Sequence, residues 1–160
     1  MTFSSKNLQK IEQLKKKYPK VEALTLPLLW IVQYQEGYIS LDAIKEVAKY
    51  CNKSAMEVYS VASFYTMFNL QPVGKYHIQV CKTLSCKLCG QEDIFSSLKN
   101  ILDINTNQTT DDNLFTLSQV ECLGSCGTSP VMEINDKYYE NLTPQKVEDI
   151  IEELKDDKRS

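Results

Sequence analysis

Four of the six cysteines stand in two close pairs, and such pairs are typical of metal sites. Cys81 and Cys86 form a C-x4-C pair, and Cys122 and Cys126 form a C-x3-C pair. Each pair follows a segment that predicts a β-strand. Because neighbouring strand ends lie close together in a sheet, the two pairs can converge. Four thiolates in one place suit a [2Fe-2S] cluster or a structural zinc ion.

The second pair lies in the segment CLGSCGTSP, whose glycines favour a tight loop around sulfur. Gly124 and Gly127 let the backbone turn sharply, so that N–H groups can approach the thiolates. Such donors stabilise an anionic cluster and tune its potential. Beside the first pair, the start of a helix after Cys86 is expected to favour the thiolate form through the helix dipole.

Cys89 leaves an alternative ligand set open. Cys81, Cys86 and Cys89 spell C-x4-C-x2-C, the beginning of the plant-type ferredoxin spacing. In that case Cys122 would be the fourth ligand and Cys126 would be spare, and the glycine-rich loop would have no explanation. We therefore favour the interpretation that Cys89 is a small side chain in the first turn of a helix, without a ligand role.

Two other kinds of site compete with an iron–sulfur cluster. A zinc ion fits the same four cysteines, although neither pair has the C-x2-C spacing usual in zinc ribbons. Cys86 and Cys89 do have C-x2-C spacing near a helix start, as the redox-active dithiol of thioredoxins has. Cys51, in contrast, is expected to be a helix-end thiol with no ligand role.

Composition and charge indicate a globular protein in a reducing compartment. Hydrophobic residues make up 42% of the 160 residues and charged residues 24%, which argues against disorder. Residues 1–10 lack the apolar core of a secretory signal, and the richest apolar stretch, residues 23–32, is shorter than the ~20 residues of a membrane span. We therefore expect a cytoplasmic chain without direct membrane insertion, whose thiols stay reduced. The net charge of −3 makes nucleic acid a poor partner.

Residues 1–72 are predicted to form helices only. Leu8 and Ile11 begin a helical pattern that Pro19 ends. Ser54 and Glu57 have the spacing of a capping box at the start of a short helix. This helix is expected over residues 54–64. Two further helices are expected, one from residue 21 or 26 to residue 35 and one from residue 40 to residue 50.

Residues 73–160 predict a unit of strands and helices. Its elements are expected to be a strand over residues 75–81, a helix over 87–103, a polar connection over 105–113, a strand over 114–121, a hairpin over 131–134 and 137–140, and a last helix from residue 144. Thr143 and Pro144 have the residue types that start a helix. The predicted class is therefore α+β, with one domain over residues 1–72 and a second over residues 73–160.

Three segments carry a resemblance to a known family. VCKTLSCKLCG at residues 80–90, VECLGSCGTSPVMEIND at 120–136 and YYENLTPQ at 138–145 resemble the thioredoxin-like [2Fe-2S] subunit, known as the E subunit, of bacterial NADH:quinone oxidoreductase, respiratory complex I. FYTMFNLQPVGKYHIQVC at residues 64–81 and the helical N-terminus are similar to it as well. The resemblance covers about residues 10–155.

The resemblance implies an N-terminal four-helix bundle followed by a thioredoxin-like α/β domain that carries a [2Fe-2S] cluster. It implies that Cys81 and Cys86 hold one iron and that Cys122 and Cys126 hold the other. It also implies docking onto a flavoprotein subunit that binds FMN and NADH, beside larger peripheral-arm subunits at the cytoplasmic face of the inner membrane. The chain has no G-x-G-x-x-G or P-loop segment, so FMN and NADH are expected on the partner only.

The resemblance favours one assembly among several, and the sequence departs from the family pattern at two places. Similar subunits serve NAD-linked hydrogenases and formate dehydrogenases, and the FYTMF and ECLGSC segments favour complex I among them. Cys89 stands where the family usually has another residue, and residues 127–129 replace bulkier ones. Neither departure removes a ligand.

Segment 64–68, Trp30 and His77 are expected to have mainly structural roles. The aromatic and methionine residues of segment 64–68 are expected to pack between the two units, or alternatively to form a docking surface for the partner subunit. Trp30 is assigned to a core, and His77 is assigned a structural place in a strand.

Overall fold

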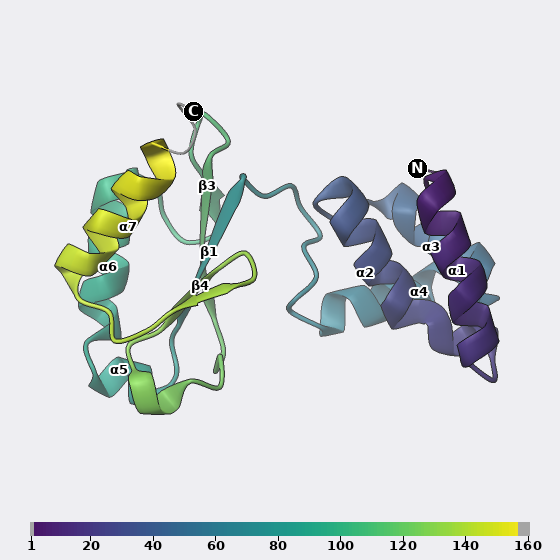
Figure 1. The fold of residues 1–160 in the computed structure, drawn as a ribbon, viewed down its shortest axis with the longest axis horizontal. Helices are drawn as coiled ribbons and strands as arrows, with labels where there is room; N and C mark the ends of the chain where they lie inside the picture. Colours follow the sequence, from purple (N-terminus) through teal and green to yellow (C-terminus); the bar gives the residue numbers. More distant parts are fainter. Residues whose placement is uncertain (1, 157–160) are drawn as a thin grey trace. The chain divides into compact units, whose positions relative to one another are not determined.

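The chain divides into a helical unit, residues 1–72, and a sheet-containing unit, residues 73–160 (Figure 1). The structure is a computed structural model and describes residues 2–156. Helices precede a five-stranded mixed sheet, which confirms the predicted α+β class. Within residues 2–156, no helix has both the length and the apolar character that crossing a bilayer requires.

The helices of the helical unit lie close to the ranges that the sequence predicts, with ends that differ by one or more residues. Its elements are α1 (Ser5–Lys17), the 3-10 turn η1 (Val21–Leu24), α2 (Thr25–Glu36), α3 (Leu41–Cys51) and α4 (Ala55–Phe64). The Ser40 side chain caps α3, and Ser54 and Glu57 form the predicted capping box of α4. Gly37 ends α2 in the left-handed conformation, with φ of +81°.

Phe68 and Cys51 are buried in the core of the helical unit, and Trp30 packs against this core. Phe68 is buried there, and its ring lies 5.3 Å from the Trp30 ring. Phe64, from the same aromatic segment, is 77% exposed. Cys51 is the last residue of α3 and is fully buried in this core, where burial raises the pKa of its thiol.

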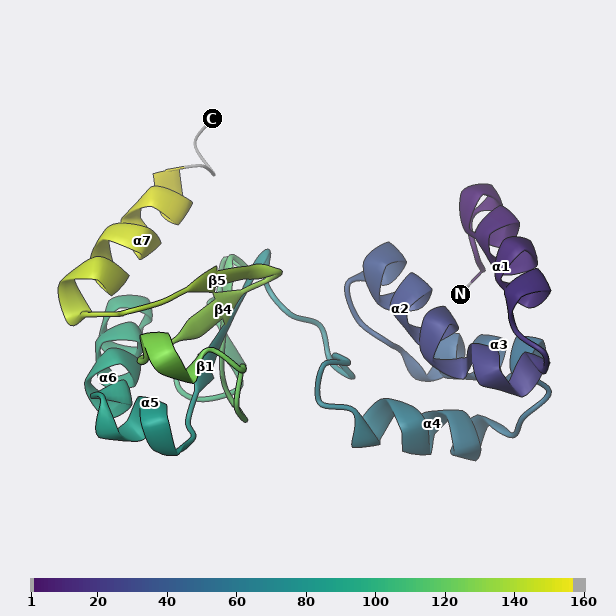
Figure 2. The ribbon, with the colours of Figure 1, turned by 60° about the horizontal axis from the view of Figure 1, so that its bottom comes forward.

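The sheet unit places a parallel strand pair at its centre. Its elements are β1 (Tyr76–Cys81), α5 (Leu84–Leu88), α6 (Gln91–Leu102), β2 (Gln108–Thr109), β3 (Phe115–Val120), the 3-10 turn η2 (Cys126–Thr128), β4 (Met132–Ile134), β5 (Lys137–Tyr139) and α7 (Pro144–Asp156). The strand order is β2-β3-β1-β4-β5; the neighbours β1 and β3 pair in parallel, and the other three neighbouring pairs are antiparallel. Helices α6 and α7 lie side by side over one face of the sheet (Figures 1 and 2).

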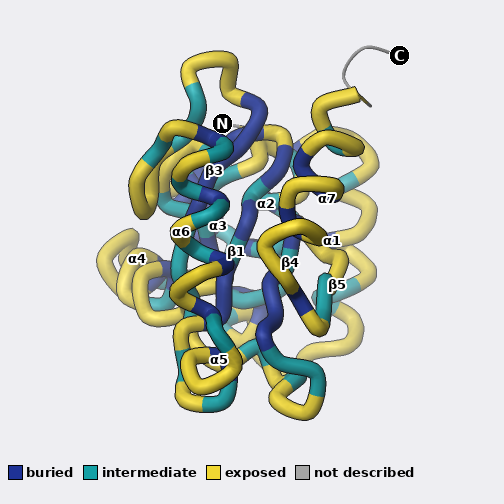
Figure 3. Tube along the Cα trace, turned by 90° about the vertical axis from the view of Figure 1, so that its left-hand side faces the viewer, coloured by how far each residue is buried: buried dark blue, intermediate teal, exposed yellow. Residues whose placement is uncertain are grey.

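The core of this unit lies between the sheet and these two helices. The tube in Figure 3 is buried along much of β1 and β3. Ile78 of β1 pairs with Leu117 of β3, and both side chains are fully buried. Val147 and Ile151 of α7 pack into the same cluster. The packed sheet therefore fixes where the carboxyl ends of β1 and β3 lie.

Two predictions of secondary structure in this unit are wrong. The expected helix over residues 87–103 is two helices, because Gly90 has φ of +93° and breaks the helical path between α5 and α6. Helix α5 begins at Leu84 and contains Cys86, so Cys86 does not precede a helix start. The polar connection over residues 105–113 contains the edge strand β2, which is too short to show an alternation. The β4–β5 hairpin and α7 are confirmed.

Gly74 lies where the sheet unit begins, and alanine should not fit there. A Cβ atom at Gly74 would lie 2.9 Å from the carbonyl carbon and oxygen of Leu114, and the Gly74 N–H donates a buried hydrogen bond of 2.7 Å to Thr116 Oγ1. Gly74→Ala is expected to lower the free energy of unfolding by about 1–3 kcal/mol, as overpacking does. Urea unfolding of the metal-free protein measures it. Gly127→Ala, where a Cβ meets no atom within 4 Å, is the matched control, and equal losses would contradict this account.

His77 gives the sheet unit a pH dependence. Its Nε2 lies 2.9 Å from Ser118 Oγ, and burial lowers the pKa of the imidazole. The unfolded chain takes up a proton at about pH 6.5, whereas the folded chain takes it up only at lower pH. Stability therefore falls as the pH decreases below about 6.5, by at most ~1.4 kcal/mol per pH unit. His77→Gln should lose less stability than the unmodified protein between pH 7 and pH 5.5 in urea unfolding, and equal losses would exclude this role.

Candidate metal centre

The parallel pairing of β1 and β3 brings the two cysteine pairs to one end of the sheet. Cys81 is the last residue of β1 and stands in register with Val120, the last residue of β3. The Lys82 N–H donates to the Val120 carbonyl at 3.0 Å, so the strands stay joined where they end. Cys122 follows two residues later. Both pairs therefore follow the carboxyl ends of two neighbouring parallel strands, at the same end of the sheet.

The first pair is buried. Cys81 and Cys86 are each 2% exposed and pack together with Val131. Cys81 Sγ lies 3.2 Å from Thr83 Oγ1, and Cys86 Sγ lies 3.4 Å from Ser129 Oγ. Each thiol therefore has a hydroxyl group beside it that can donate a hydrogen bond to sulfur when the thiol is ionised.

The second pair is exposed and lies in the irregular loop between β3 and β4. Cys122 Sγ and Cys126 Sγ are 3.5 Å apart. The Gly124 N–H points at Cys122 Sγ over 3.3 Å, and Gly124 has φ of +82°, a conformation that glycine adopts at little cost. This is the close N–H approach expected of Gly124. Gly127 lies in the tight turn η2, as expected, but without a positive φ, so no left-handed conformation requires glycine there.

Within each pair one thiol loses its proton more easily than the other. Burial raises the pKa of Cys86. Burial also acts to raise the pKa of Cys81, but hydrogen bonds from Thr83, from the Leu123 backbone and from Cys86 together outweigh it and lower that pKa. The Gly124 N–H lowers the pKa of Cys122, and the adjacent Cys122 raises the pKa of Cys126. Two thiols that resist joint ionisation can both become thiolates when a cation is bound between them.

Hydroxyl groups link helix α5 to the loop of the second cysteine pair. Ser129, which follows that pair, lies within hydrogen-bond distance of Cys86 in α5. The Ser85 side chain, also in α5, forms a hydrogen bond with Cys126 that acts to lower the pKa of that thiol. Figures 1 and 2 show α5 beside the turn η2. Among residues 2–156, no three or more His, Cys, Asp or Glu side chains are grouped so as to hold a metal ion.

The possible metal ligands are therefore two pairs of thiols. The thiols of the first pair lie beside hydroxyl groups, and those of the second pair lie beside each other. A [2Fe-2S] cluster takes four cysteine thiolates, two for each of its irons. The thiol chemistry of these donors and their arrangement in two pairs fit that group, while within residues 2–156 the two pairs are not drawn together into one metal-binding set. The residues that would hold it are Cys81, Cys86, Cys122 and Cys126.

Cys89 occupies a different position from the one expected. It follows the last residue of α5, and its backbone N–H donates to the Ser85 and Cys86 carbonyls at 3.1 and 3.2 Å. It therefore lies at the end of a short helix and not in the first turn of a longer one. Its side chain is exposed, whereas that of Cys86 is buried.

The sequence reasoning missed the polar groups around the four thiols. The sequence pattern assigned no role to Thr83 or Ser85, and it singled out Ser129 only within residues 127–129, which replace bulkier ones. Ser129 is 43 positions from Cys86, so no local pattern could connect the two. The only available signal was the density of Ser and Thr beside the cysteines.

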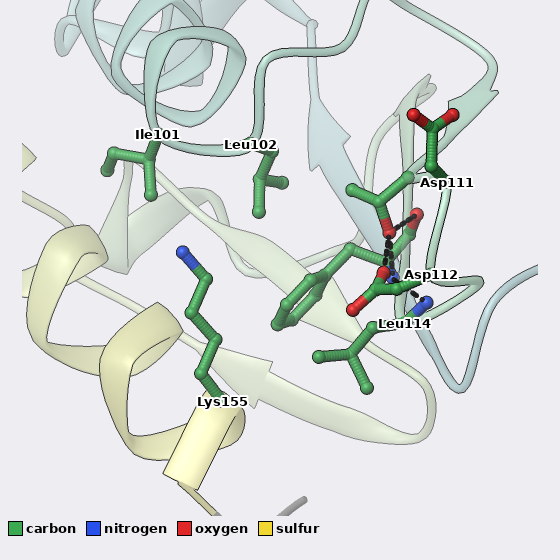
Figure 4. A pocket seen from close by; sticks show the side chains of 8 residues that line it. Ile101, Leu102, Asp111, Asp112, Leu114 and Lys155 are labelled. Atoms are coloured by element: carbon green, nitrogen blue, oxygen red, sulfur yellow. Dashed lines mark hydrogen bonds between the residues drawn. The ribbon is translucent and has the colours of Figure 1, made fainter.

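A hollow of about 510 Å³ lies at the other end of the sheet unit (Figure 4). Leu114 and Phe115, at the beginning of β3, form part of its wall, and Lys155 of α7 lines its opposite side. Cys81 ends β1, and Cys122 and Cys126 follow the end of β3, so this hollow is not part of the thiol site. Its wall residues Leu114 and Phe115 belong to the core of the unit.

Known proteins resemble this chain over nearly its whole length. The model of the family described as thioredoxin-like [2Fe-2S] ferredoxin matches residues 11–155. The chain is 47% identical to the E subunit of the NADH-quinone oxidoreductase of Rickettsia bellii, over 98% of this chain and 95% of that protein. It is 43% identical to the mitochondrial NADH dehydrogenase [ubiquinone] flavoprotein 2 of Dictyostelium discoideum, over 98% of this chain and 64% of that protein.

A solved structure shares the fold at lower sequence identity. An NAD+-reducing [NiFe]-hydrogenase in the air-oxidized state superposes with a TM-score of 0.71 and 21% identity. The match covers 81% of this chain and 23% of the hydrogenase chain. At this identity the likeness concerns the fold.

Proposed function

The chain belongs to the thioredoxin-like [2Fe-2S] ferredoxin family, and from this premise we propose that it is the electron-transfer subunit of an NADH:quinone oxidoreductase. In this proposal Cys81, Cys86, Cys122 and Cys126 hold one [2Fe-2S] cluster. The observation that carries it is the arrival of two thiol pairs at one sheet edge, at the ends of the parallel strands β1 and β3. Relatives named as E subunits of NADH-quinone oxidoreductase, 47% identical over 98% of the chain, support the oxidoreductase assignment.

The two thiol pairs have different tasks in this proposal. When bound, a [2Fe-2S] cluster supplies one-electron chemistry at the site. Cys81 and Cys86 lie in the protein interior and exclude water from their side of the site. Cys122 and Cys126 lie at the surface and form the side that a redox partner can approach. Thr83, Ser129 and the Gly124 N–H are placed to donate hydrogen bonds to sulfur, which stabilises negative charge there.

The partner in this proposal is a flavoprotein subunit that carries FMN and NADH, together with larger peripheral-arm subunits at the cytoplasmic face of the inner membrane. The sequence of this chain contains neither a G-x-G-x-x-G nor a P-loop segment. The relatives that are named as subunits of NADH-quinone oxidoreductase support an assembly with other chains. Electrons would pass between FMN on the partner and the thiol-ligated site of this chain.

Anaerobic reduction by NADH tests this proposal. The reconstituted protein is mixed with NADH alone, or with NADH and the FMN-binding subunit that co-purifies with it. We expect the visible absorption to bleach only when the flavoprotein is present, because this chain has no nucleotide site of its own. Bleaching by NADH alone would contradict the proposal, and so would co-purification with a hydrogenase subunit in place of the quinone-linked assembly.

A further inference from the structure

The end of β5 and the residues after it run along the loop of the second cysteine pair and bond to it at several points. The Tyr138 hydroxyl donates to the Leu123 carbonyl at 3.0 Å. The Asn141 N–H donates to the Thr128 carbonyl at 2.7 Å. We call residues 138–142 the strap. It contacts the cysteine loop at both ends, before Gly124 and after Cys126.

Glu140 makes the central contact of the strap. Ser125 Oγ and Thr128 Oγ1 both donate to Glu140 Oε1, the second over 2.7 Å. The two hydroxyls hold the pKa of the Glu140 carboxyl below its usual range. Lys146 of α7 donates to the Glu140 backbone carbonyl at 2.6 Å, so the glutamate is itself attached to a packed helix.

The second cysteine pair needs such support more than the first. Cys81 ends a central strand and Cys86 lies in a helix, and both are 2% exposed, so packing fixes them. Cys122 and Cys126 are exposed and lie outside every strand of the described chain. Ser125 directly precedes Cys126, and therefore a bond to Ser125 sets the direction of the Cys126 backbone.

We propose that Glu140 is a positioning residue that holds the Cys122–Cys126 loop in its metal-binding shape through Ser125 and Thr128. This inference rests on the proposed function and deepens it, since it assigns a role to a residue that is not a ligand. Residues that orient metal ligands typically account for about 10–100-fold in metal affinity. Glu140 acts through the loop and does not touch the cluster ligands themselves.

Four substitutions separate the roles of hydrogen bonding and charge. Glu140→Ala removes the acceptor of both hydroxyls. Glu140→Gln keeps an oxygen at the same place and removes the charge. Glu148→Ala removes a charge from an exposed position on α7 of the same unit and is the matched control. Ser125→Ala breaks the contact from the loop side and serves if Glu140→Ala does not fold, as judged by circular dichroism.

The first measurement is the rate at which a chelator removes the cluster from the reconstituted protein. We expect Glu140→Ala to lose it about 10–100-fold faster than the unmodified protein, Glu140→Gln to lose it at an intermediate rate, and Glu148→Ala to match the unmodified protein. The spectrum of the reduced protein in electron paramagnetic resonance should broaden in Glu140→Ala and return toward normal in Glu140→Gln. Equal rates for Glu140→Ala and Glu148→Ala would overturn the inference.

The second measurement needs no metal and separates this inference from the proposed function. The Thr128 N–H donates to the Ser125 carbonyl at 3.2 Å, and its hydrogen exchange reports whether the loop holds its shape. In the metal-free protein we expect faster exchange at Thr128 in Glu140→Ala and no change in Glu148→Ala. Unchanged exchange in Glu140→Ala would contradict the role of Glu140. Failure of the unmodified protein to bind iron would instead contradict the proposed function.

Discussion

Replacing Cys86 with alanine is expected to reduce the bound iron to background. Cys86 is buried inside α5, beside Cys81 and the Ser129 hydroxyl, so no water or flexible side chain can take its place without opening the loop. Removal of one of four thiolates leaves an iron with an incomplete set of ligands. Iron and acid-labile sulfide are measured on protein that has been reconstituted anaerobically. Circular dichroism confirms that the chain has folded.

Cys89→Ser is the matched control for this prediction. Cys89 is three positions farther along, at the end of α5, and its side chain is exposed. We expect this variant to keep its iron and its visible spectrum. If Cys89→Ser loses the cluster and Cys86→Ala keeps it, the plant-type spacing is correct and the ligand set proposed here is wrong.

Replacing Leu117 with alanine is expected to cause a large loss of stability in the sheet unit. Leu117 is fully buried in β3 and stands in register with Ile78 on one side and Gln108 on the other. Truncation of a buried leucine leaves a cavity and lowers the free energy of unfolding by about 2–5 kcal/mol. Urea unfolding of the metal-free protein, followed by circular dichroism, measures the change.

Leu88→Ala provides the same chemical change at the surface of the same unit. Leu88 is 78% exposed on α5, so its truncation leaves no cavity. We expect a change within about 0.5 kcal/mol. A loss at Leu88 as large as the loss at Leu117 would mean that α5 is covered in the metal-free chain and that the burial described for these residues is incorrect.

The helices that the sequence predicted well are those with strong local signals. Ser40, Ser54 and Gly37 mark helix ends by bonding within a few residues, and the structure has them as caps. The break at Gly90 was missed because the apolar pattern of α6 is clear, while α5 is too short to show a pattern of its own. The edge strand β2 was missed because it is a short strand, held by its pairing to β3.

In the candidate site, too, local patterns were predictable from the sequence and contacts between distant residues were not. The spacing of the cysteines and the strand patterns before them were sufficient to predict that the two pairs follow two strand ends, and β1 and β3 are neighbours in the sheet. The groups that hold the pairs come from distant positions: Ser129 is 43 residues from Cys86, and Glu140 is 15 residues from Ser125. Contacts of this kind follow from how the hairpin β4–β5 folds back beside the cysteine loop, and a linear pattern cannot show them.

Metal analysis of the anaerobically reconstituted protein tests the central claim most directly. Iron, zinc and acid-labile sulfide are counted per chain, and the reduced protein is examined by electron paramagnetic resonance. If Cys81, Cys86, Cys122 and Cys126 hold a [2Fe-2S] cluster, the protein contains two irons and two sulfides, and its visible absorption bleaches on one-electron reduction. A colourless protein with one zinc and no iron would contradict the claim.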